Sequence, residues 1–168
     1  MPSTTSTPPQ SPRRAADAAH TFVPLEENLA HDRTLSQGAP AEPLFGVLPI
    51  RRIIPQDLHS VMDYANGVAC MTDAVLTDDP RARLASILLG VGVTSVSLMT
   101  DYRLSVAKVI PIETHELIDH AWGVAAIASP FVLGYWKSAP RVALSHVIAG
   151  ASTIIGALFT DYRAYRRR

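Results

Sequence analysis

Residues 54–69 read IPQDLHSVMDYANGVA and residues 110–125 read IPIETHELIDHAWGVA, and the two stretches are identical at eight of sixteen positions without a gap. A second pair of segments, residues 80–103 and 140–163, is identical at nine of twenty-four positions. Both members of this pair begin with Pro-Arg and end with Thr-Asp-Tyr-Arg. Seventeen identities in forty aligned positions are far above chance. The chain therefore contains a duplicated unit, and this repeat decides the architecture.

The second half of each repeat is apolar enough to be a membrane span. Residues 84–100, LASILLGVGVTSVSLMT, carry no charge, and residues 142–160 carry His146 as their one ionisable group. A helix of this length, rising about 1.5 Å per residue, can cross a hydrocarbon layer of about 30 Å. A soluble four-helix bundle is the alternative, but a soluble helix has a charged face and residues 84–100 have none.

The first half of each repeat, residues 56–77 and 112–136, is less apolar but occupies matching positions. The sequence therefore predicts an all-α fold of four transmembrane helices, built as two parallel two-helix repeats. Repeat 1 spans residues 54–103 and repeat 2 spans residues 110–163, within a membrane domain over residues 49–163.

The N-terminal segment has a different composition. Nine of the thirteen prolines fall in residues 1–55, and the first forty residues are rich in Ser, Thr and Ala. Such a segment lacks the apolar periodicity that offsets its ordering entropy, so we predict a disordered tail over residues 1–48. It also lacks the apolar run of a secretory signal. Residues 164–168 form a separate basic end.

Composition excludes several function classes. A formal net charge of zero argues against a nucleic-acid partner, which requires a basic surface. The single cysteine, Cys70, excludes an intramolecular disulfide and a multi-cysteine zinc site. No phosphate-binding loop, nucleophile elbow or Cys/His pair is visible. We therefore expect no catalytic residue, no cofactor and no enzymatic activity.

Lysine and arginine near the helix ends predict orientation, because basic loops stay in the cytoplasm. The stretches next to the helix ends, residues 51–52, 103–108 and 163–168, carry eight basic residues, against four in the two hairpin turns. The sequence predicts a plasma-membrane protein with both termini cytoplasmic. The eight are Arg51, Arg52, Arg103, Lys108, Arg163, Arg166, Arg167 and Arg168, and the four are Arg81, Arg83, Lys137 and Arg141.

A polar stripe follows one face of the first helix. Its members recur at i, i+4, i+7, i+11 and i+14, which places them within one narrow arc of a helix. Because a carboxylate within a membrane needs an inward position and a partner, this face should point into the bundle. The stripe is His59, Asp63, Asn66, Cys70 and Asp73, and its matches in repeat 2 are His115, Asp119, Trp122, Ala126 and Ser129.

The parallel repeats should bring several polar residues into one layer at the cytoplasmic end. The candidate members are His59, Asp63, Asp101, Arg103, His115, Asp119, Asp161 and Arg163. Asp73 lies apart, without an equivalent acidic residue in repeat 2.

Two interpretations of this layer remain open. In the structural one, each His pairs with the Asp four residues later, and the arginines pair with nearby carboxylates or reach the lipid phosphates. In the other, the layer is a proton or metal site, since His and Asp serve both purposes. The structural one is favoured because no tight ligand motif, such as two His on one helical turn, is present. We therefore predict no metal site.

The segment Ser129-Pro130-Phe131 within a two-span repeat resembles the SPW-repeat integral membrane proteins, which are named for a Ser-Pro-Trp motif late in the first helix of each repeat. The resemblance covers residues 50–163. Phe131 replaces the motif tryptophan, and repeat 1 has Asp73-Ala74-Val75 at the corresponding place. The resemblance implies a small prokaryotic membrane protein without an assigned activity.

Pro130 predicts a local distortion. It removes one backbone hydrogen bond from its helix and should kink or unwind it around Ser129.

Three functions are compatible with these features. The favoured one is a structural or accessory protein that contacts the bilayer and associates with other membrane proteins, or with itself, through stripes of small residues. These stripes are Ser86, Gly90 and Thr94, and Ser145, Ala149 and Thr153. The second is a small transporter or proton-handling protein that uses Asp63, Asp119 and Asp73. The weakest is a membrane enzyme.

Overall fold

The computed structural model describes residues 42–162. The predictions for residues 1–41, for Arg163 and for the basic C-terminal end therefore lie outside the described residues. Within the described part, the predicted all-α fold with four long helices is confirmed. The helices are α4 (Gln56–Leu76), α5 (Pro80–Met99), α6 (Ile112–Val132) and α7 (Pro140–Phe159).

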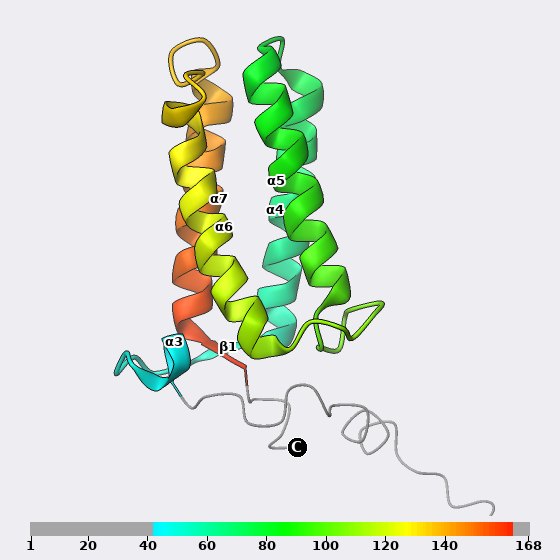
Figure 1. Cartoon of the computed structure of the whole chain (residues 1–168), viewed down its shortest axis with the longest axis vertical. Coiled ribbons are helices and arrows are strands. Elements are labelled where there is room, and N and C mark those ends of the chain that lie inside the picture. Colours follow the sequence, from blue (N-terminus) through cyan, green and yellow to red (C-terminus); the bar gives the residue numbers. More distant parts are fainter. Residues whose placement is uncertain (1–41, 163–168) are drawn as a thin grey trace, which may run out of the picture. The chain divides into compact units, whose positions relative to one another are not determined.

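Each repeat forms one helical hairpin, as predicted. Helix α4 packs along α5 and α6 along α7, while α4–α7 and α5–α6 contacts join the two repeats. Figure 1 shows the two hairpins side by side, with both tight turns at one end. The helices approach closely at glycine pairs in equivalent positions, Gly67 with Gly90 and Gly123 with Gly150. A Cβ atom added to Gly123 would lie 2.8 Å from the carbonyl oxygen of Gly150. Gly90, one of the small residues predicted as packing seams, thus contacts a partner within the chain.

Proline and aspartate define the helix starts. Pro80 and Pro140 are the first residues of α5 and α7, where a missing N–H costs little. The side chain of Asp79 caps α5 by accepting hydrogen bonds from the backbone N–H groups of Arg81 and Ala82. The hydroxyl of Ser138 also donates to Asp79 at 2.5 Å and, with these backbone donors, lowers the pKa of the carboxyl. The two hairpin turns are therefore joined at this aspartate.

Helix α6 ends earlier than predicted. It passes through Pro130 and stops at Val132, four residues before the expected end at residue 136. Gly134 follows with a positive φ of 74°, a conformation that favours glycine and terminates the helix. The hydrogen bond that Pro130 cannot make is replaced locally, because the hydroxyl of Ser129 donates to the carbonyl of Ala126 at 2.9 Å.

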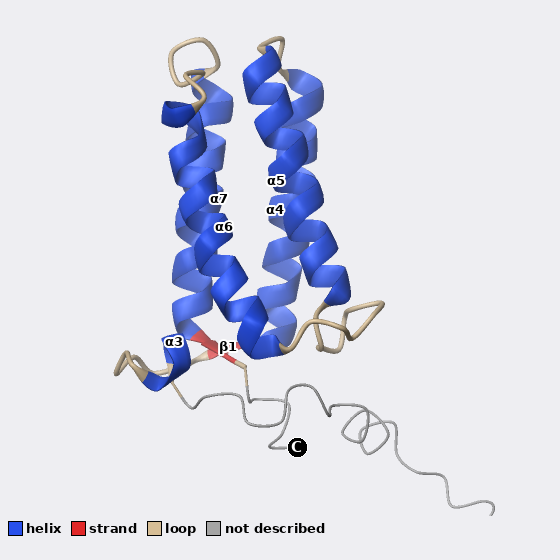
Figure 2. Cartoon of the chain, viewed as in Figure 1, coloured by secondary structure: helices blue, strands red, loops and turns tan. Residues whose placement is uncertain are grey.

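Short extended segments that the sequence analysis did not predict connect the repeats. Strand β1 (Ile54–Pro55) pairs in parallel with β2 (Thr160–Asp161), as Figure 2 shows below the helices. In the equivalent arrangement, a single β-bridge joins Thr100, at the end of repeat 1, to Ile110, at the start of repeat 2. The entry of each repeat is thus bonded to the exit of the other.

The boundary predicted for the tail also differs from the structure. Residues 42–48 were assigned to the disordered segment, yet a short helix, α3 (Pro43–Gly46), lies against α6. Its backbone is held by a buried carboxylate, since the N–H of Leu44 donates to Oε1 of Glu116 at 2.6 Å. The composition of the segment could not reveal this long-range contact.

Several titratable side chains lie inside the bundle together with small apolar ones, and many large apolar side chains face outward. His59, Asp63, His115 and Asp119 are at most 2 % exposed, whereas Val68 and Val124 are 68 % and 60 % exposed. By length and composition, α5 and α7 are each able to cross a membrane.

Candidate functional site

Four polar side chains from the two repeats meet near the start of the odd-numbered helices. His59 and Asp63 come from α4, and His115 and Asp119 come from the equivalent positions of α6. One nitrogen or oxygen atom from each lies within 4.8 Å of the corresponding atoms of the others. We call these four residues the His/Asp centre. The structure therefore brings together four of the residues predicted to share one layer.

The shortest contact within the His/Asp centre crosses between the repeats. Nε2 of His59 lies 2.9 Å from Oδ2 of Asp119 but 3.7 Å from Oδ1 of Asp63 in its own helix. Nε2 of His115 lies 3.2 Å from Oδ2 of Asp63 and 3.2 Å from Oδ2 of Asp119. The i, i+4 pairs expected from the sequence are present, but the repeats also exchange partners.

Two threonines fix the orientation of the histidines. Oγ1 of Thr100 lies 2.9 Å from Nδ1 of His115, and Oγ1 of Thr160 lies 2.9 Å from Nδ1 of His59. Each hydroxyl donates its one proton to the carbonyl four residues earlier in its helix, at 2.7 Å and 2.6 Å respectively. The threonine oxygen must then accept from the histidine, so each Nδ1 carries a proton. Each Nε2 consequently points into the His/Asp centre.

These threonines also cross between repeats. Thr100 ends α5 in repeat 1 and holds the histidine of repeat 2, whereas Thr160 follows α7 in repeat 2 and holds the histidine of repeat 1. Both belong to the duplicated Thr-Asp-Tyr-Arg sequence. The repetition of this sequence could have pointed to both threonines as site residues. It did not indicate which histidine each threonine would contact.

The two halves of the His/Asp centre differ in their remaining partners. The hydroxyl of Ser97 donates to Oδ2 of Asp63 at 2.9 Å, and the equivalent residue in repeat 2 is Ala157. Asp119 instead accepts from the hydroxyl of Tyr162 at 3.4 Å. Burial raises the pKa of Tyr162, so this phenol stays a neutral donor. The carboxylates are therefore solvated by protein hydroxyl groups.

A buried ion pair covers one side of the His/Asp centre. Nη2 of Arg52 lies 3.1 Å from Oε1 of Glu116 on α6, and both side chains are at most 2 % exposed. The guanidinium of Arg52 also lies over the ring of Tyr162, 5.1 Å from its centroid. Tyr162 in turn packs edge-on against His59. This ion pair connects the linker before α4 to the His/Asp centre.

Among the described residues, three other predicted members of the layer, Asp101, Arg103 and Asp161, do not belong to the His/Asp centre. Arg103 pairs with Asp57 at 3.2 Å on the surface, and Asp161 is half-buried in β2. Asp101 is 1 % exposed, and among the described residues neither of its carboxylate oxygens has a hydrogen-bond partner.

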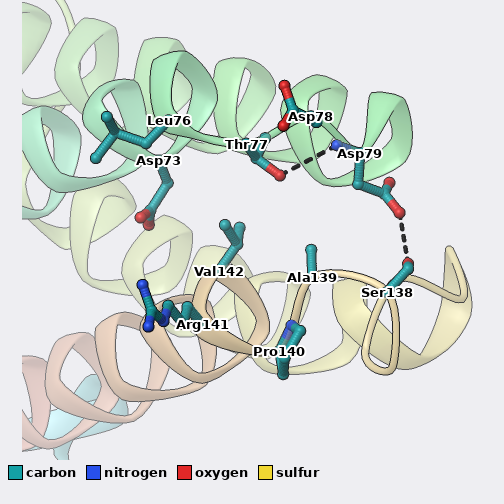
Figure 3. Close-up of a pocket in the computed structure, with 10 residues that line it drawn as sticks. All are labelled: Asp73, Leu76, Thr77, Asp78, Asp79, Ser138, Ala139, Pro140, Arg141 and Val142. Carbon is teal, nitrogen blue, oxygen red and sulfur yellow. Dashed lines mark hydrogen bonds between the residues drawn. The ribbon is translucent and has the colours of Figure 1, made fainter.

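Asp73 lies at the far end of α4, near the hairpin turns. It lines an open pocket of about 430 Å³. Figure 3 shows its carboxylate across from the side chain of Arg141 on α7. Within the described part of the chain, Oδ2 of Asp73 has no hydrogen-bond partner. Asp73 is about 15 Å along the helix from Asp63, at about 1.5 Å per residue, so the two carboxylates belong to different sites.

The Ser-Pro motif is part of a second buried network. The hydroxyl of Ser129 lies 2.5 Å from that of Tyr135, which lies 2.7 Å from Nδ1 of His146. Nε2 of His146 lies 3.0 Å from the hydroxyl of Ser86 on α5, again between repeats. Phe131, in contrast, is 57 % exposed and stacks near Trp136 at a centroid distance of 5.7 Å. Ser129 and Pro130 therefore shape the interior, and Phe131 lies on the surface.

Comparison with known proteins gives one match. A family model described as the SPW repeat domain matches residues 57–160, which include all four helices except one residue of α4. No curated protein and no solved structure matches the chain.

Proposed function

The chain belongs to the SPW-repeat family, and from this membership we propose that it is a multi-pass protein of the prokaryotic plasma membrane, with α4, α5, α6 and α7 all crossing the bilayer. The outward faces of α4 and α6 support this proposal. Val61 and Leu117 occupy equivalent positions on these helices and are 52 % and 51 % exposed. Apolar side chains outside and paired polar ones inside are the arrangement that a bilayer stabilises.

The orientation follows from the basic residues. Arg51, Arg52, Arg103 and Lys108 lie at the end that carries the His/Asp centre, and the basic C-terminal sequence continues from the same end. The hairpin turns carry fewer basic residues. We place this end and both termini in the cytoplasm, because short basic loops are retained there.

Within the membrane the protein acts as a structural or accessory component without enzymatic activity. One observation carries this proposal: several buried polar side chains form contacts that cross between the two repeats. His59 contacts Asp119, and Asn66 donates to Thr153 on α7 at 2.9 Å. Trp122, the equivalent of Asn66, donates to the carbonyl of Leu89 on α5 at 3.0 Å. Polar groups used in this way hold helices together.

The packing between the two ends supports this role over transport. A transported ion or proton would have to pass from the His/Asp centre to the pocket at Asp73. The intervening interior is filled by close glycine contacts and by an apolar cluster of Cys70, Leu89 and Ala126, with Trp122 packed against it. Among these residues only the thiol of Cys70 can titrate, and a single thiol does not form a relay over the distance of about 15 Å between Asp63 and Asp73.

The partners follow from the exposed surface. The small residues Ser86 and Gly90 are buried between helices of this chain. Contacts with other membrane proteins, or with a second copy, would therefore use the outward apolar faces that also contact lipid. Co-purification from native membranes identifies such partners, and no nucleic-acid partner is expected.

Two experiments test the proposal. A reporter fused after Arg168 should read out as cytoplasmic, and one inserted in the turn at residues 133–139 as periplasmic; the opposite pattern would contradict the orientation. The variant that combines Asp63→Asn with Asp119→Asn should yield less folded protein in the membrane. The structural role would be wrong if the wild type carried a proton or ion flux in proteoliposomes that the folded double variant had lost.

A further inference from the structure

The His/Asp centre has the dimensions of a four-coordinate metal site. Its four nitrogen–oxygen contacts between histidine and aspartate measure 2.9, 3.2, 3.2 and 3.7 Å. A tetrahedral zinc ion with ligands at about 2.0–2.1 Å separates neighbouring ligand atoms by about 3.3 Å. The four ligand atoms, one from each residue, lie within 4.8 Å of one another, so a bound ion would draw them slightly closer together.

The histidines present the atoms that a metal needs. Because Thr100 and Thr160 accept the Nδ1 protons, the neutral form of each imidazole carries its free lone pair on Nε2. Threonine oxygens that fix the tautomer in this way are typical of the groups that support metal-binding histidines. Both Nε2 atoms face the carboxylates, and that of His59 lies 2.9 Å from Oδ2 of Asp119.

One of these two Nε2 atoms has, in the described part of the chain, no hydrogen-bond partner that accounts for its position. Nε2 of His115 is fully buried and, among the described residues, forms no hydrogen bond, although two carboxylate oxygens lie 3.2 Å away. An N–H group would be aimed at one of these oxygens. Nε2 instead lies at the same distance from both oxygens, as expected if its lone pair and the two oxygens all bind one central cation.

The charges are consistent with this arrangement. Asp63 and Asp119 contribute two negative charges to a site in which no side chain of the centre is more than 3 % exposed. Two neutral histidines and one divalent cation make the site neutral, which removes most of the cost of burying the carboxylates. Neither repeat can provide this alone, because each contributes one His and one Asp.

In place of the sequence-based prediction of no metal site, we propose that His59, Asp63, His115 and Asp119 together bind one divalent transition-metal ion per chain. Zinc is the best match to two imidazole nitrogens and two carboxylate oxygens. All four coordination positions are filled by protein, so the ion is structural and joins the two repeats. This goes beyond the proposed accessory role and does not depend on the orientation of the chain in the membrane.

The competing arrangement has the same net charge. Two protonated histidines could pair with the two carboxylates and require no metal. The two arrangements differ in metal content, in the ligand field around a substituted ion, and in the response to a chelator.

The test uses the full-length protein purified in detergent without a chelator. Elemental analysis should find about one zinc ion per chain. After treatment with a chelator, zinc chloride should restore that content, and cobalt(II) chloride should give the strong visible absorption of a tetrahedral ion. A folded wild type that holds no stoichiometric metal and binds neither ion would overturn the proposal.

Variants locate the ion. Asp119→Asn should lower zinc affinity at least tenfold, whereas the matched control His120→Asn, one residue away and outside the centre, should keep it. If Asp119→Asn does not fold, Thr100→Val keeps all four ligands and should weaken binding by about 10–100-fold, as the loss of a supporting group does. Unchanged zinc affinity in folded Asp119→Asn or Thr100→Val protein would contradict the assignment.

Discussion

Replacing Ser129 by alanine should destabilise the protein because the Ser129 hydroxyl supplies a hydrogen bond that Pro130 cannot. In a regular helix the N–H of residue 130 would donate to the carbonyl of Ala126. Proline has no N–H, and the Ser129 hydroxyl donates to that carbonyl at 2.9 Å instead. The Ser-Pro pair therefore acts as a unit, in which the serine compensates for the proline.

The magnitude follows from the burial of the acceptor. Ala126 is fully buried, so its carbonyl would lose its partner where water cannot replace it. An unsatisfied buried acceptor costs about 1–3 kcal/mol. Tyr135 would keep His146 as a hydrogen-bond partner, which limits the additional loss. We expect Ser129→Ala to lower the free energy of unfolding by about 1–3 kcal/mol.

Ser152 is a matched control in α7. Its hydroxyl donates to the carbonyl of Ala149, also three residues earlier and also at 2.9 Å. The next residue is Thr153, whose backbone N–H continues the helix and already satisfies that carbonyl. Ser152→Ala should therefore change the free energy of unfolding by less than about 0.5 kcal/mol.

The assay is reversible unfolding of both variants in detergent micelles, combined with Pro130→Ala. Restoring an N–H at residue 130 should make Ser129→Ala nearly neutral in that background. The reasoning would be refuted if Ser129→Ala and Ser152→Ala had equal effects, or if the cost of Ser129→Ala were the same with alanine at position 130.

Three further predictions can be tested by the same unfolding measurements. Gly150→Ala should lower the free energy of unfolding by about 1–3 kcal/mol because its Cβ would overlap the facing backbone. Gly92→Ala should not destabilise the protein, since a Cβ there meets nothing within 4 Å. Equal losses of stability in the two variants would contradict the close contact between the helices. Glu116→Gln should lower the free energy of unfolding by about 3–5 kcal/mol because it leaves a buried arginine unpaired. Asp57→Asn, which breaks an exposed pair, should lower it by less than about 1 kcal/mol. A Glu116→Gln variant as stable as the wild type would show that the buried ion pair does not stabilise the fold. The folded-state pKa of Asp79 lies below the ordinary value of 3.8. The stability that ionised Asp79 contributes is therefore present above pH 3.8 and is lost as the pH falls through the folded-state pKa. Asp79→Asn should make the free energy of unfolding depend less on pH in this acidic range, and an unchanged dependence would show that the cap has no such effect.

Much of the fold could be predicted because the sequence repeats itself. The matched Pro-Arg starts and the matched uncharged runs place α5 and α7, and the stripe of His59 and Asp63 gives the inward face of α4. The end of α6 could not be placed in the same way. Its stop after Val132 depends on the positive φ of Gly134, which hydrophobic periodicity does not report.

The candidate site was predicted in its location but not in its pairing. Parallel repeats require His59 and His115 to lie at the same end, and this prediction is confirmed by the 5.7 Å distance between their ring centroids. Linear spacing, however, indicates contacts only within one helix. The cross-repeat contact of His59 with Asp119 and the role of Thr160 depend on how one hairpin packs against the other.

We propose that the duplication builds a single four-ligand centre from two incomplete halves. X-ray absorption spectroscopy of the full-length protein loaded with one equivalent of zinc tests it most directly. We predict four nitrogen or oxygen ligands at about 2.0–2.1 Å, with the scattering pattern of two imidazoles and no sulfur. A shell that contained the thiolate of Cys70, a single imidazole, or six oxygen ligands typical of loosely bound hydrated zinc would contradict it.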